Sequence, residues 1–474
     1  MSRLIRLTCA AASVGLAASL GCSVIGTADY DECSTALDCR ASFGFGSVCG
    51  DDGLCTTAAP AARCTQTFPE DLWSRPDKYK DAIVLGSLMD RSSETHAARE
   101  RASRLAVKQV NEEGGLEGQN FAIVYCTYEA NLSYDDKKPA DAAVDSAHYL
   151  AVTLGVPAIL GPAGSADVSA VYQTLADAGT LVISPSATSP ALTDLDPPAT
   201  DAAPGLLWRT APPDTLQGPA IAADMTQRGV SDIFLIAQKG AYGEGLATVF
   251  QDAFDGDVTL RVFGSENERA ALITEGGSAA ASEVLFISSA QTDLVAFLIA
   301  AGQNPGYADK TFFLTDSAAN KEVIDGAPSA LRARVRGTRP TPVSDADPVF
   351  NNFSGAYASE YKEDVTAFSF AAHTYDAAWL VFYGAASSSF ASNQVTGVGI
   401  AKGLRKLSSG KAYDIAPLNW GGILETLRGG GVVDVRGASG ALDYDPVTEE
   451  TSADIQVWVI GAAAEGGYEV QPAP

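Results

Sequence analysis

The sequence predicts an α/β protein made of two doubly wound parallel-sheet units. Short, continuous apolar runs alternate with segments of helical spacing, which is typical of parallel strands covered by helices on both faces. The alternation restarts after a stretch rich in Pro, Ala and Asp at 196–205. The chain of 474 residues is long enough for two or three domains.

The first unit begins with the buried strand DAIVLGSLM, residues 81–89. Ser93 is placed to cap a helix whose apolar face is formed by Ala98, Ala102, Leu105, Ala106 and Val110. Five further elements follow in order: strand FAIVYC, a helix opened by Pro139, strand PAIL, a helix bearing Val168, Val171, Tyr172 and Leu175, and then strand LVI. Each connection is short, so successive strands are expected in one sheet.

The second unit repeats this pattern. Its predicted strands are DIFLIA, VTLRVF, EVLFIS and TFFLT, with helices starting near Tyr242 and Asp293. Two helical stretches follow at 367–386 and 395–408, and DIQVWVI reads as one more strand close to the end of the chain.

The composition excludes one class of partner. The formal net charge is -26 and the pI is about 4.4, whereas 46% of the residues are hydrophobic and 19% are charged. These last two values are ordinary for a globular protein, but a surface this acidic repels a phosphate backbone. We therefore expect no nucleic-acid partner.

The N-terminus has the features of an export signal. Arg3 and Arg6 precede a short apolar stretch, residues 7–20, which is too short to span a membrane. The sequence Ser-Leu-Gly-Cys at 19–22 resembles a bacterial lipoprotein signal, in which Cys22 would become the lipidated first residue, although such signals usually carry Leu where Ser19 stands. Ordinary signal cleavage nearby is the alternative. Residues 1–21 are the expected signal peptide, and no other apolar run is long enough for a membrane helix.

Cysteine usage agrees with export. Six cysteines lie outside the signal and the lipidation candidate: Cys33, Cys39, Cys49, Cys55, Cys64 and Cys126. The first four lie close together in a Gly-rich segment with little to bury, so disulfides are expected there, and Cys64 and Cys126 are left for each other. A zinc site is the alternative, but no His is nearby and no CxxC occurs. Residues 22–63 form this Cys-rich segment and end in a linker, TTAAPAAR, at 56–63.

Polar loops follow several predicted strands, and ligands of open parallel sheets bind beyond the carboxyl ends of the strands. GPAGSAD follows PAIL, and SPSATSP, residues 184–190, follows LVI. Ser165 at a helix start, with Ser186, Ala187 and Thr188 on the neighbouring loop, could hold a carboxylate through hydroxyls and free amides. Alternatively, Ser165 only caps its helix and the other hydroxyls only satisfy turns.

Two residues of the second unit have similar alternatives. Asp316 follows strand TFFLT and could pair with a ligand ammonium group, or it could be a helix N-cap. Tyr242 could cover the ligand or simply pack on its loop.

Catalytic signals are weak. The chain has three His (His96, His148 and His373), all of which fit structural positions better than catalytic ones, and it has no GxSxG, HExxH or P-loop motif. We expect a protein that is not an enzyme and that uses no cofactor or metal.

From about residue 80 to 462 the chain resembles the type I periplasmic binding proteins, specifically the leucine/isoleucine/valine and amide family of ABC-transporter substrate-binding proteins. The stretches that carry the resemblance are RLAVKQVNEEGGLEGQNFAIVYC, PAILGPAGSADVSAVYQTLADAGTLVISPSATSPALTD, LLWRTAPPDTLQGPAIAADM, AYGEGLATVFQDAF, AAHTYDAAWLVFYGA and GASGALDYD. Their order and spacing together are specific to this family.

The resemblance implies two lobes joined by a three-crossing hinge, with the ligand between them. The crossings are expected near 200–207, 334–341 and 432–440. Residues 80–204 plus 340–432 would then form lobe 1, and residues 205–339 plus 433–474 would form lobe 2. Closure of the lobes around a ligand would be a hinge motion.

The resemblance also implies roles for single residues. Ser165 and Thr188 would contact a ligand carboxylate, Ser186 would contribute through its backbone, and Tyr242 is the tyrosine of AYGEG. The acid that binds the amino group aligns only approximately, to Asp316 or to Ser317. Where relatives often carry an aromatic residue after the EVLFIS strand, this chain has Ser-Ser-Ala-Gln at 288–291, which leaves a ligand larger than an α-amino acid, or of another kind, as an alternative.

The resemblance favours an extracytoplasmic lipoprotein that delivers a small polar ligand, amino acid or amide-like, to an ABC permease. The alternative is a surface receptor of the same fold that works without a transporter, and the Cys-rich segment favours this alternative. A hydrolase on the same scaffold is disfavoured by the shortage of His. The only membrane contact would be the lipid anchor. The protein would be located on the periplasmic side of the membrane. Because Ser23 rather than Asp follows Cys22, the anchoring membrane would be the outer membrane.

Overall fold

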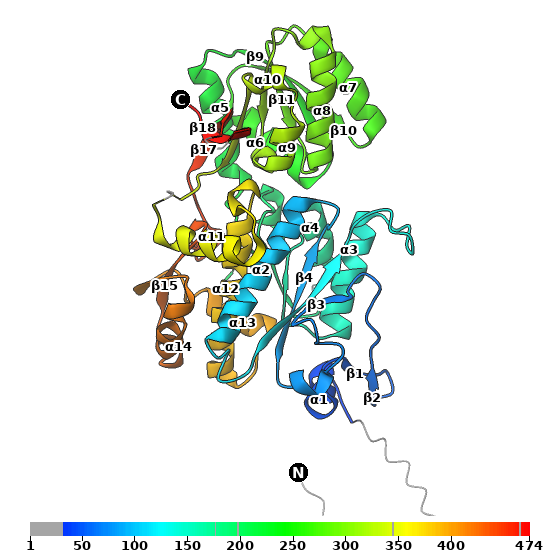
Figure 1. Ribbon diagram of the computed structural model, residues 1–474, viewed down its shortest axis with the longest axis vertical. Helices are drawn as coiled ribbons and strands as arrows, with labels where there is room; N and C mark the ends of the chain where they lie inside the picture. The colour runs from blue at the N-terminus through cyan, green and yellow to red at the C-terminus, as the bar shows by residue number, and fades with distance from the viewer. Residues whose placement is uncertain (1–31, 176, 197–198, 344–345, 464–465) are drawn as a thin grey trace, which may run out of the picture.

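The computed structural model describes residues 32–175, 177–196, 199–343, 346–463 and 466–474, which fold into two α/β lobes and a small N-terminal module (Figure 1). Cys22 and the signal segment lie outside the described residues. Within the described part of the chain, no helix has the length and apolar character needed to cross a lipid bilayer.

Lobe 1 is built on a six-stranded sheet with the order β3-β5-β4-β6-β7-β8. Its strands are β3 (Gln66–Phe68), β4 (Ile83–Met89), β5 (Phe121–Thr127), β6 (Ala158–Leu160), β7 (Leu181–Ser184) and β8 (Leu207–Arg209). All neighbours are parallel except β3 and β5. The apolar runs therefore form the expected doubly wound sheet, to which β3 adds an antiparallel edge.

Helices cover both faces of this sheet. They are α2 (Glu94–Glu112), α3 (Pro139–His148), α4 (Ser165–Thr174), α11 (Pro348–Tyr361), α12 (Ala371–Ser392), α13 (Gly397–Leu404) and α14 (Trp420–Arg428). Ile83 and Leu85 of β4 pack in one core with α2 and α12, and Val84 packs in the other with α3. This alternation follows from the period of two in a strand, and it explains why all seven residues of β4 are apolar or small.

Lobe 2 is built on a seven-stranded sheet with the order β10-β9-β11-β12-β13-β17-β18. Its strands are β9 (Asp232–Gln238), β10 (Asp257–Phe263), β11 (Glu283–Ile287), β12 (Thr311–Leu314), β13 (Val335–Pro340), β17 (Ile455–Ala462) and β18 (Tyr468–Pro472). Helices α5 (Asp214–Gln227), α6 (Ala241–Ala253), α7 (Glu266–Ser278), α8 (Gln291–Gln303), α9 (Lys321–Gly326) and α10 (Ser329–Arg332) pack around it. The sheet is parallel from β10 to β13, and the returning chain adds β17 and β18 antiparallel.

The strand pairing moves the expected crossings. Residues 335–340, which were expected in the second crossing at 334–341, form β13 between β12 and β17 of lobe 2. Residues 207–209 pair with β7, so the chain leaves lobe 1 after Arg209 and not at 204. Strands β14 (Lys411–Asp414), β15 (Val433–Gly437) and β16 (Gly440–Ala441) form a small separate sheet. Val433 and Val435 are buried in the core of α12, which keeps residues 433–444 with lobe 1.

We therefore propose crossings at about 210–213, 341–347 and 445–454. The amide of Thr341 donates to the carbonyl of Asp454 at 2.8 Å, so the second and third crossings run side by side. In Figure 1 the lobes are joined by these thin connections.

The N-terminal module contains α1 (Ala36–Phe43), β1 (Ser47–Cys49) and β2 (Cys55–Thr57). The six cysteines form three disulfides, Cys33–Cys49, Cys39–Cys55 and Cys64–Cys126, as expected from an exported chain. Three of the sulfurs cluster, but all are bonded in disulfides, which leaves no thiolate there for zinc. Arg40 donates to the carbonyl of Leu154 at 2.6 Å and thereby fixes the module to lobe 1.

Candidate functional site

The loop after β7, residues 184–190, is largely satisfied by its own hydroxyls. The Ser184 hydroxyl accepts from the amide of Ala187 at 3.1 Å and donates to the carbonyl of Pro162 at 2.6 Å. The Ser165 hydroxyl accepts from the amide of Ser189 at 3.2 Å. These bonds agree with the turn interpretation for part of the loop. Ser165 does not cap its helix: Gly164 is the N-cap, and no side-chain cap bond is formed.

Thr188 differs from its neighbours in this loop. The residue is 2% exposed, and its hydroxyl lies close enough to the Asp214 carboxylate to lower the pKa of that acid, although the two form no well-aligned hydrogen bond. Its carbonyl accepts from the amide of Asp214 at 2.7 Å. Because Asp214 begins α5, the first helix of lobe 2, Thr188 lies where the two lobes meet.

Lobe 2 contributes a buried acidic cluster opposite Thr188, formed by Asp214, Gln217, Tyr242 and Asp316. The side-chain amide of Gln217 donates to Asp214 at 2.6 Å and to Asp316 at 3.3 Å. The Tyr242 hydroxyl donates to Asp316 and lies 2.7 Å from the Thr315 hydroxyl. Asp316 therefore contacts Tyr242 and Gln217, and α9 is capped by Asn320 instead.

Burial raises the pKa of Asp214 and of Asp316, and the charge of Asp316 raises the pKa of Asp214 further. Two acids that share so small a volume do not both ionise readily. The pair therefore retains a proton near neutral pH, or accepts a cation in its place. The pKa of Tyr242 is raised well above its ordinary value, chiefly by burial, so its hydroxyl keeps its proton.

A buried arginine lies on the lobe 1 side. Arg99 of α2 is 3% exposed and donates from Nη1 to the Ser186 hydroxyl at 3.0 Å. It also donates to the carbonyl of Ser369 at 3.0 Å and to the Ser369 hydroxyl at 3.3 Å. Its guanidinium lies 5.3 Å from the ring centre of Phe370. Sequence reasoning missed Arg99, because an arginine in RERASR reads as a solvated helix face.

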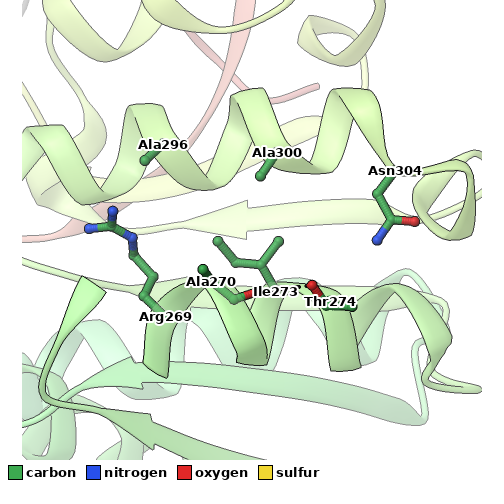
Figure 2. A pocket seen from close by; sticks show the side chains of 7 residues that line it. All are labelled: Arg269, Ala270, Ile273, Thr274, Ala296, Ala300 and Asn304. Carbon is green, nitrogen blue, oxygen red and sulfur yellow. Dashed lines mark hydrogen bonds between the residues drawn. The ribbon is translucent and has the colours of Figure 1, made fainter. Parts of the chain in front are cut away.

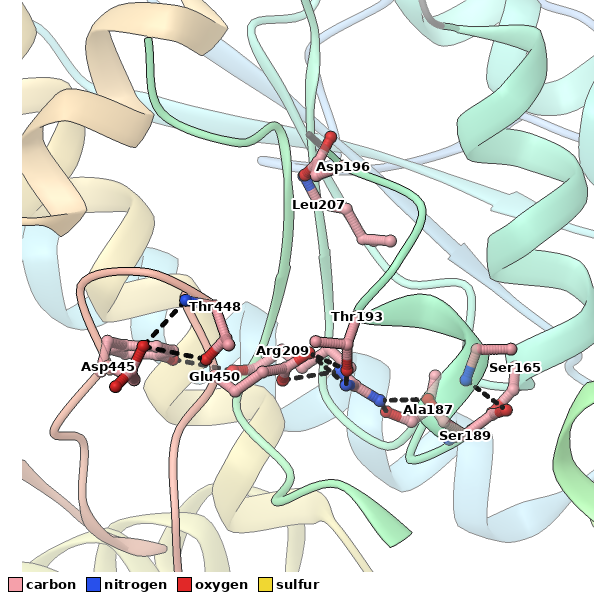
Figure 3. A network of polar contacts seen from close by, with 12 residues as sticks. Ser165, Ala187, Ser189, Thr193, Asp196, Leu207, Arg209, Asp445, Thr448 and Glu450 are labelled. Carbon is pink, nitrogen blue, oxygen red and sulfur yellow. Dashed lines mark hydrogen bonds and ion pairs between the residues drawn. The ribbon is translucent and has the colours of Figure 1, made fainter. Parts of the chain in front are cut away.

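A second buried arginine fixes the loop to the hinge (Figure 3). Arg209, at the end of β8, donates to the carbonyls of Ala187 and Ser189 at 3.3 and 2.8 Å. It also donates to the Thr193 hydroxyl at 2.9 Å and forms an ion pair with Glu450. Arg209 precedes the first proposed crossing and Glu450 lies on the third, so this network joins the loop to two hinge segments.

The polar segment 288–291 has no ligand-facing aromatic residue, in line with its sequence. The amide and hydroxyl of Ser289 donate to the side chain of Gln238 at 3.0 and 2.9 Å, and Ser288 donates to Asp293 at 2.9 Å. The bonds of Ser289 to Gln238 join the loop after β11 to the end of β9.

A surface hollow of about 340 Å³ lies between α7 and α8, away from this site (Figure 2). It is lined by Arg269, Ala270, Ile273, Thr274, Ala296, Ala300 and Asn304. None of these residues belongs to the loop 184–190 or to the acidic cluster. The small side chains of Ala296 and Ala300 leave the gap between the helices.

Residues 98–459 match the family described as the receptor family ligand binding region. The chain belongs to this family. The Leu/Ile/Val-binding protein BraC3 of Rhizobium johnstonii is 28% identical over 228 residues, which are 47% of this chain and 54% of that protein. The leucine-specific-binding protein of Salmonella typhimurium is 30% identical over 177 residues, 37% of this chain and 43% of that protein. The chain thus spans about half the length of the curated relatives it matches.

Solved structures agree on the fold. The branched-chain amino acid transporter substrate-binding protein LivJ of Streptococcus pneumoniae, in complex with isoleucine, has a TM-score of 0.61 and 19% identity, covering 83% of this chain and 100% of that one. A periplasmic binding protein type 1 from Bordetella pertussis has a TM-score of 0.64 and 17% identity, covering 83% and 100%. The fold of this family member is therefore that of a type I periplasmic binding protein, as the sequence resemblance implied.

Proposed function

We propose that the chain is an extracytoplasmic solute-binding lipoprotein that captures a small polar ligand, amino acid or amide-like, between its lobes and delivers it to an ABC importer. One observation carries this proposal: buried polar groups of both lobes converge where Thr188 meets Asp214, which shares the Gln217 side chain with Asp316. These groups come from loops that follow strands, where open parallel sheets bind ligands. The relatives named above are binding proteins, which supports a role without catalysis.

The two halves of the site suit opposite charges. On lobe 1, the hydroxyls of Ser165 and Thr188 lie beside the N-terminus of α4, where a carboxylate is favoured. The loop backbone at Ser186 and Ala187 borders this position. On lobe 2, Asp316 and Asp214 would accept an ammonium group in place of the shared proton. A ligand that touches both halves would stabilise the closed arrangement of the lobes.

The test is a thermal-shift screen of the mature soluble protein with amino acids, amides, short peptides, sugars and small carboxylates. A ligand at 100 times its Kd should stabilise the protein by about 2.7 kcal/mol. Thr188→Ala should weaken binding about tenfold, because it removes a buried hydroxyl that faces the ligand. Thr248→Ala, at an exposed position of α6, is the matched control. If no compound stabilises the protein, the proposal that it captures small nutrients is wrong.

Anchoring would be through Cys22, on the periplasmic side or at the outer membrane. A Cys22→Ala variant should move from the membrane fraction to the soluble fraction, whereas the wild-type N-terminal peptide should carry the mass of a diacylglyceryl group. A wild-type peptide without lipid would contradict the anchor and leave ligand capture untouched.

A surface receptor of the same fold is the second candidate. The disulfide module at 33–57 favours it, because ligand capture by two lobes does not require such a module. Uptake of the ligand found in the screen separates the two candidates. Loss of uptake on deletion of the gene supports import, whereas unchanged uptake supports the receptor.

A further inference from the structure

Arg99 is a buried cation whose partners are all neutral. Its three hydrogen bonds go to the hydroxyl and carbonyl of Ser369 and to the hydroxyl of Ser186. Within the described parts of the chain it forms no ion pair. A guanidinium carries five N–H donors, so two remain after these three bonds. Burial lowers the pKa of Arg99 to about 10, which still leaves it charged at neutral pH.

A buried charge lowers the stability of the fold unless an opposite charge or suitable hydrogen bonds compensate it. Arg209 and Arg228 show the usual solution, since each is bonded to a carboxylate. Arg40 also lacks an acid among the described residues, but it donates to the carbonyl of Leu154 at a helix C-terminus, where the helix dipole favours a cation. Among the described residues Arg99 is hydrogen-bonded to no acid: the charge of Asp316 acts on it, but the two side chains form no ion pair.

The two histidines near Arg99 carry no charge. Burial and the charge of Arg99 together lower the pKa of His96 and of His373 to about 3, so both rings are neutral. Nδ1 of His373 is buried without a hydrogen-bond partner among the described residues. Phe370, whose ring contacts both Arg99 and His373, has a φ of 61°, an uncommon value for a bulky residue. Strained backbone of this kind is concentrated at ligand sites.

Arg99 is also part of the interlobe site. It contacts Ser186, two residues from Thr188, and it feels the charge of Asp316 from lobe 2. We propose that the guanidinium of Arg99 binds a carboxylate of the ligand through its two remaining N–H donors, beside the Thr188 hydroxyl. The inference rests on the proposed function and narrows it: the ligand carries a carboxylate, and uncharged amides and sugars do not bind. Arg99 is then the residue that sets this specificity, because hydroxyls alone would accept an amide as well as an acid.

The experiment compares acids with their own amides, such as leucine with leucinamide and benzoate with benzamide, by calorimetric titration of the mature protein. Wild type should bind the acid of a pair and not the amide. Arg99→Gln should weaken acid binding about 10- to 150-fold, the range for a hydrogen bond to a charged group. Arg99→Lys should retain part of the affinity, because it keeps the charge but not the fork geometry.

Lys108→Gln is the matched control, since it removes one positive charge from the exposed face of the same helix. It should leave the affinity unchanged. Equal binding of an acid and its amide, or an Arg99→Gln variant that binds the acid like wild type, would overturn the role of Arg99 while leaving ligand capture intact. Binding of inorganic phosphate in preference to every carboxylate would also overturn it. Absence of binding by any compound would remove both proposals.

Discussion

Two buried arginines hold the same loop, residues 184–190, but their partners differ. Arg209 uses its donors on loop carbonyls, on Thr193 and on Glu450, and its charge is met within the protein. Arg99 bonds to Ser186 and Ser369 and forms no ion pair among the described residues. If the proposed role of Arg99 is right, the difference separates a residue that stabilises the fold from a residue that binds the ligand. Substitution of Arg209 should therefore lower the stability of the fold, whereas substitution of Arg99 should lower the affinity for the ligand.

The largest effect is expected at the paired arginine. Arg209→Ala leaves Glu450 and two buried carbonyls without their partner, and removal of one member of a buried ion pair costs about 3–5 kcal/mol. Chemical denaturation should show this loss in the free energy of unfolding. Arg428→Ala, which breaks an exposed pair with Glu117, should cost less than about 1 kcal/mol.

The double variant Arg209→Met with Glu450→Leu sharpens the comparison. It removes both charges at once, so it should be more stable than Arg209→Ala alone. If the single and double variants were equally unstable, the loss would come from packing around Arg209 and not from the unpaired acid.

The acidic cluster should make stability depend on pH. Because burial raises the pKa of Asp214, the folded protein keeps a proton that the unfolded chain releases above about pH 4. The free energy of unfolding should therefore fall as the pH rises from about 4 towards neutral. Asp214→Asn should flatten this slope and stabilise the ligand-free protein at pH 7 by about 1–2 kcal/mol.

Asp445 provides the opposite control. The backbone amides of Thr448 and Val447 lower its pKa, so it contributes stability at higher pH that is lost as the pH falls through the lowered pKa. Asp445→Asn should remove that gain at high pH. A stability profile that rises with pH through the range 4–7 and is unaffected by Asp214→Asn would contradict the buried acid pair.

The smallest effect on stability is expected at the unpaired arginine. Arg99→Gln loses three hydrogen bonds to neutral groups but also removes an uncompensated buried charge, so the free energy of unfolding should change by less than about 1 kcal/mol. The same denaturation experiment measures it. A loss as large as that of Arg209→Ala would make Arg99 a structural residue.

The parallel core of both lobes was predictable, because its strands are continuous apolar runs. Two strands that the sequence did not reveal, β3 and β8, have three residues each, too few for a periodic pattern. β13 was missed although it has six residues and lies inside the lobe 2 sheet, because its sequence VRGTRP is not an apolar run. The small sheet at 411–441 also escaped prediction, because its strands gain their burial only from tertiary contact with α12. These misses shifted the expected lobe limits.

The candidate site was predictable in part. Ser165, Thr188, Tyr242 and Asp316 follow strands or begin helices, so local sequence and family resemblance point to them. Arg99 and Asp214 could not be found in that way, because nothing local distinguishes a buried charge from an exposed one. A signal for Asp214 is present in LLWRTAPPDTLQG, in which an acid follows Pro213 shortly after the end of a lobe 1 strand.

The Cys64–Cys126 disulfide bears on how the protein would move when it is tethered. Cys126 lies in β5, beside the central strand of the lobe 1 sheet, and Cys64 lies just before β3, which also pairs with β5. A load applied at the N-terminus would therefore pass through this disulfide into the central sheet of lobe 1. In a protein anchored at its N-terminus, lobe 1 would therefore stay fixed relative to the membrane, and lobe 2 would rotate about the hinge.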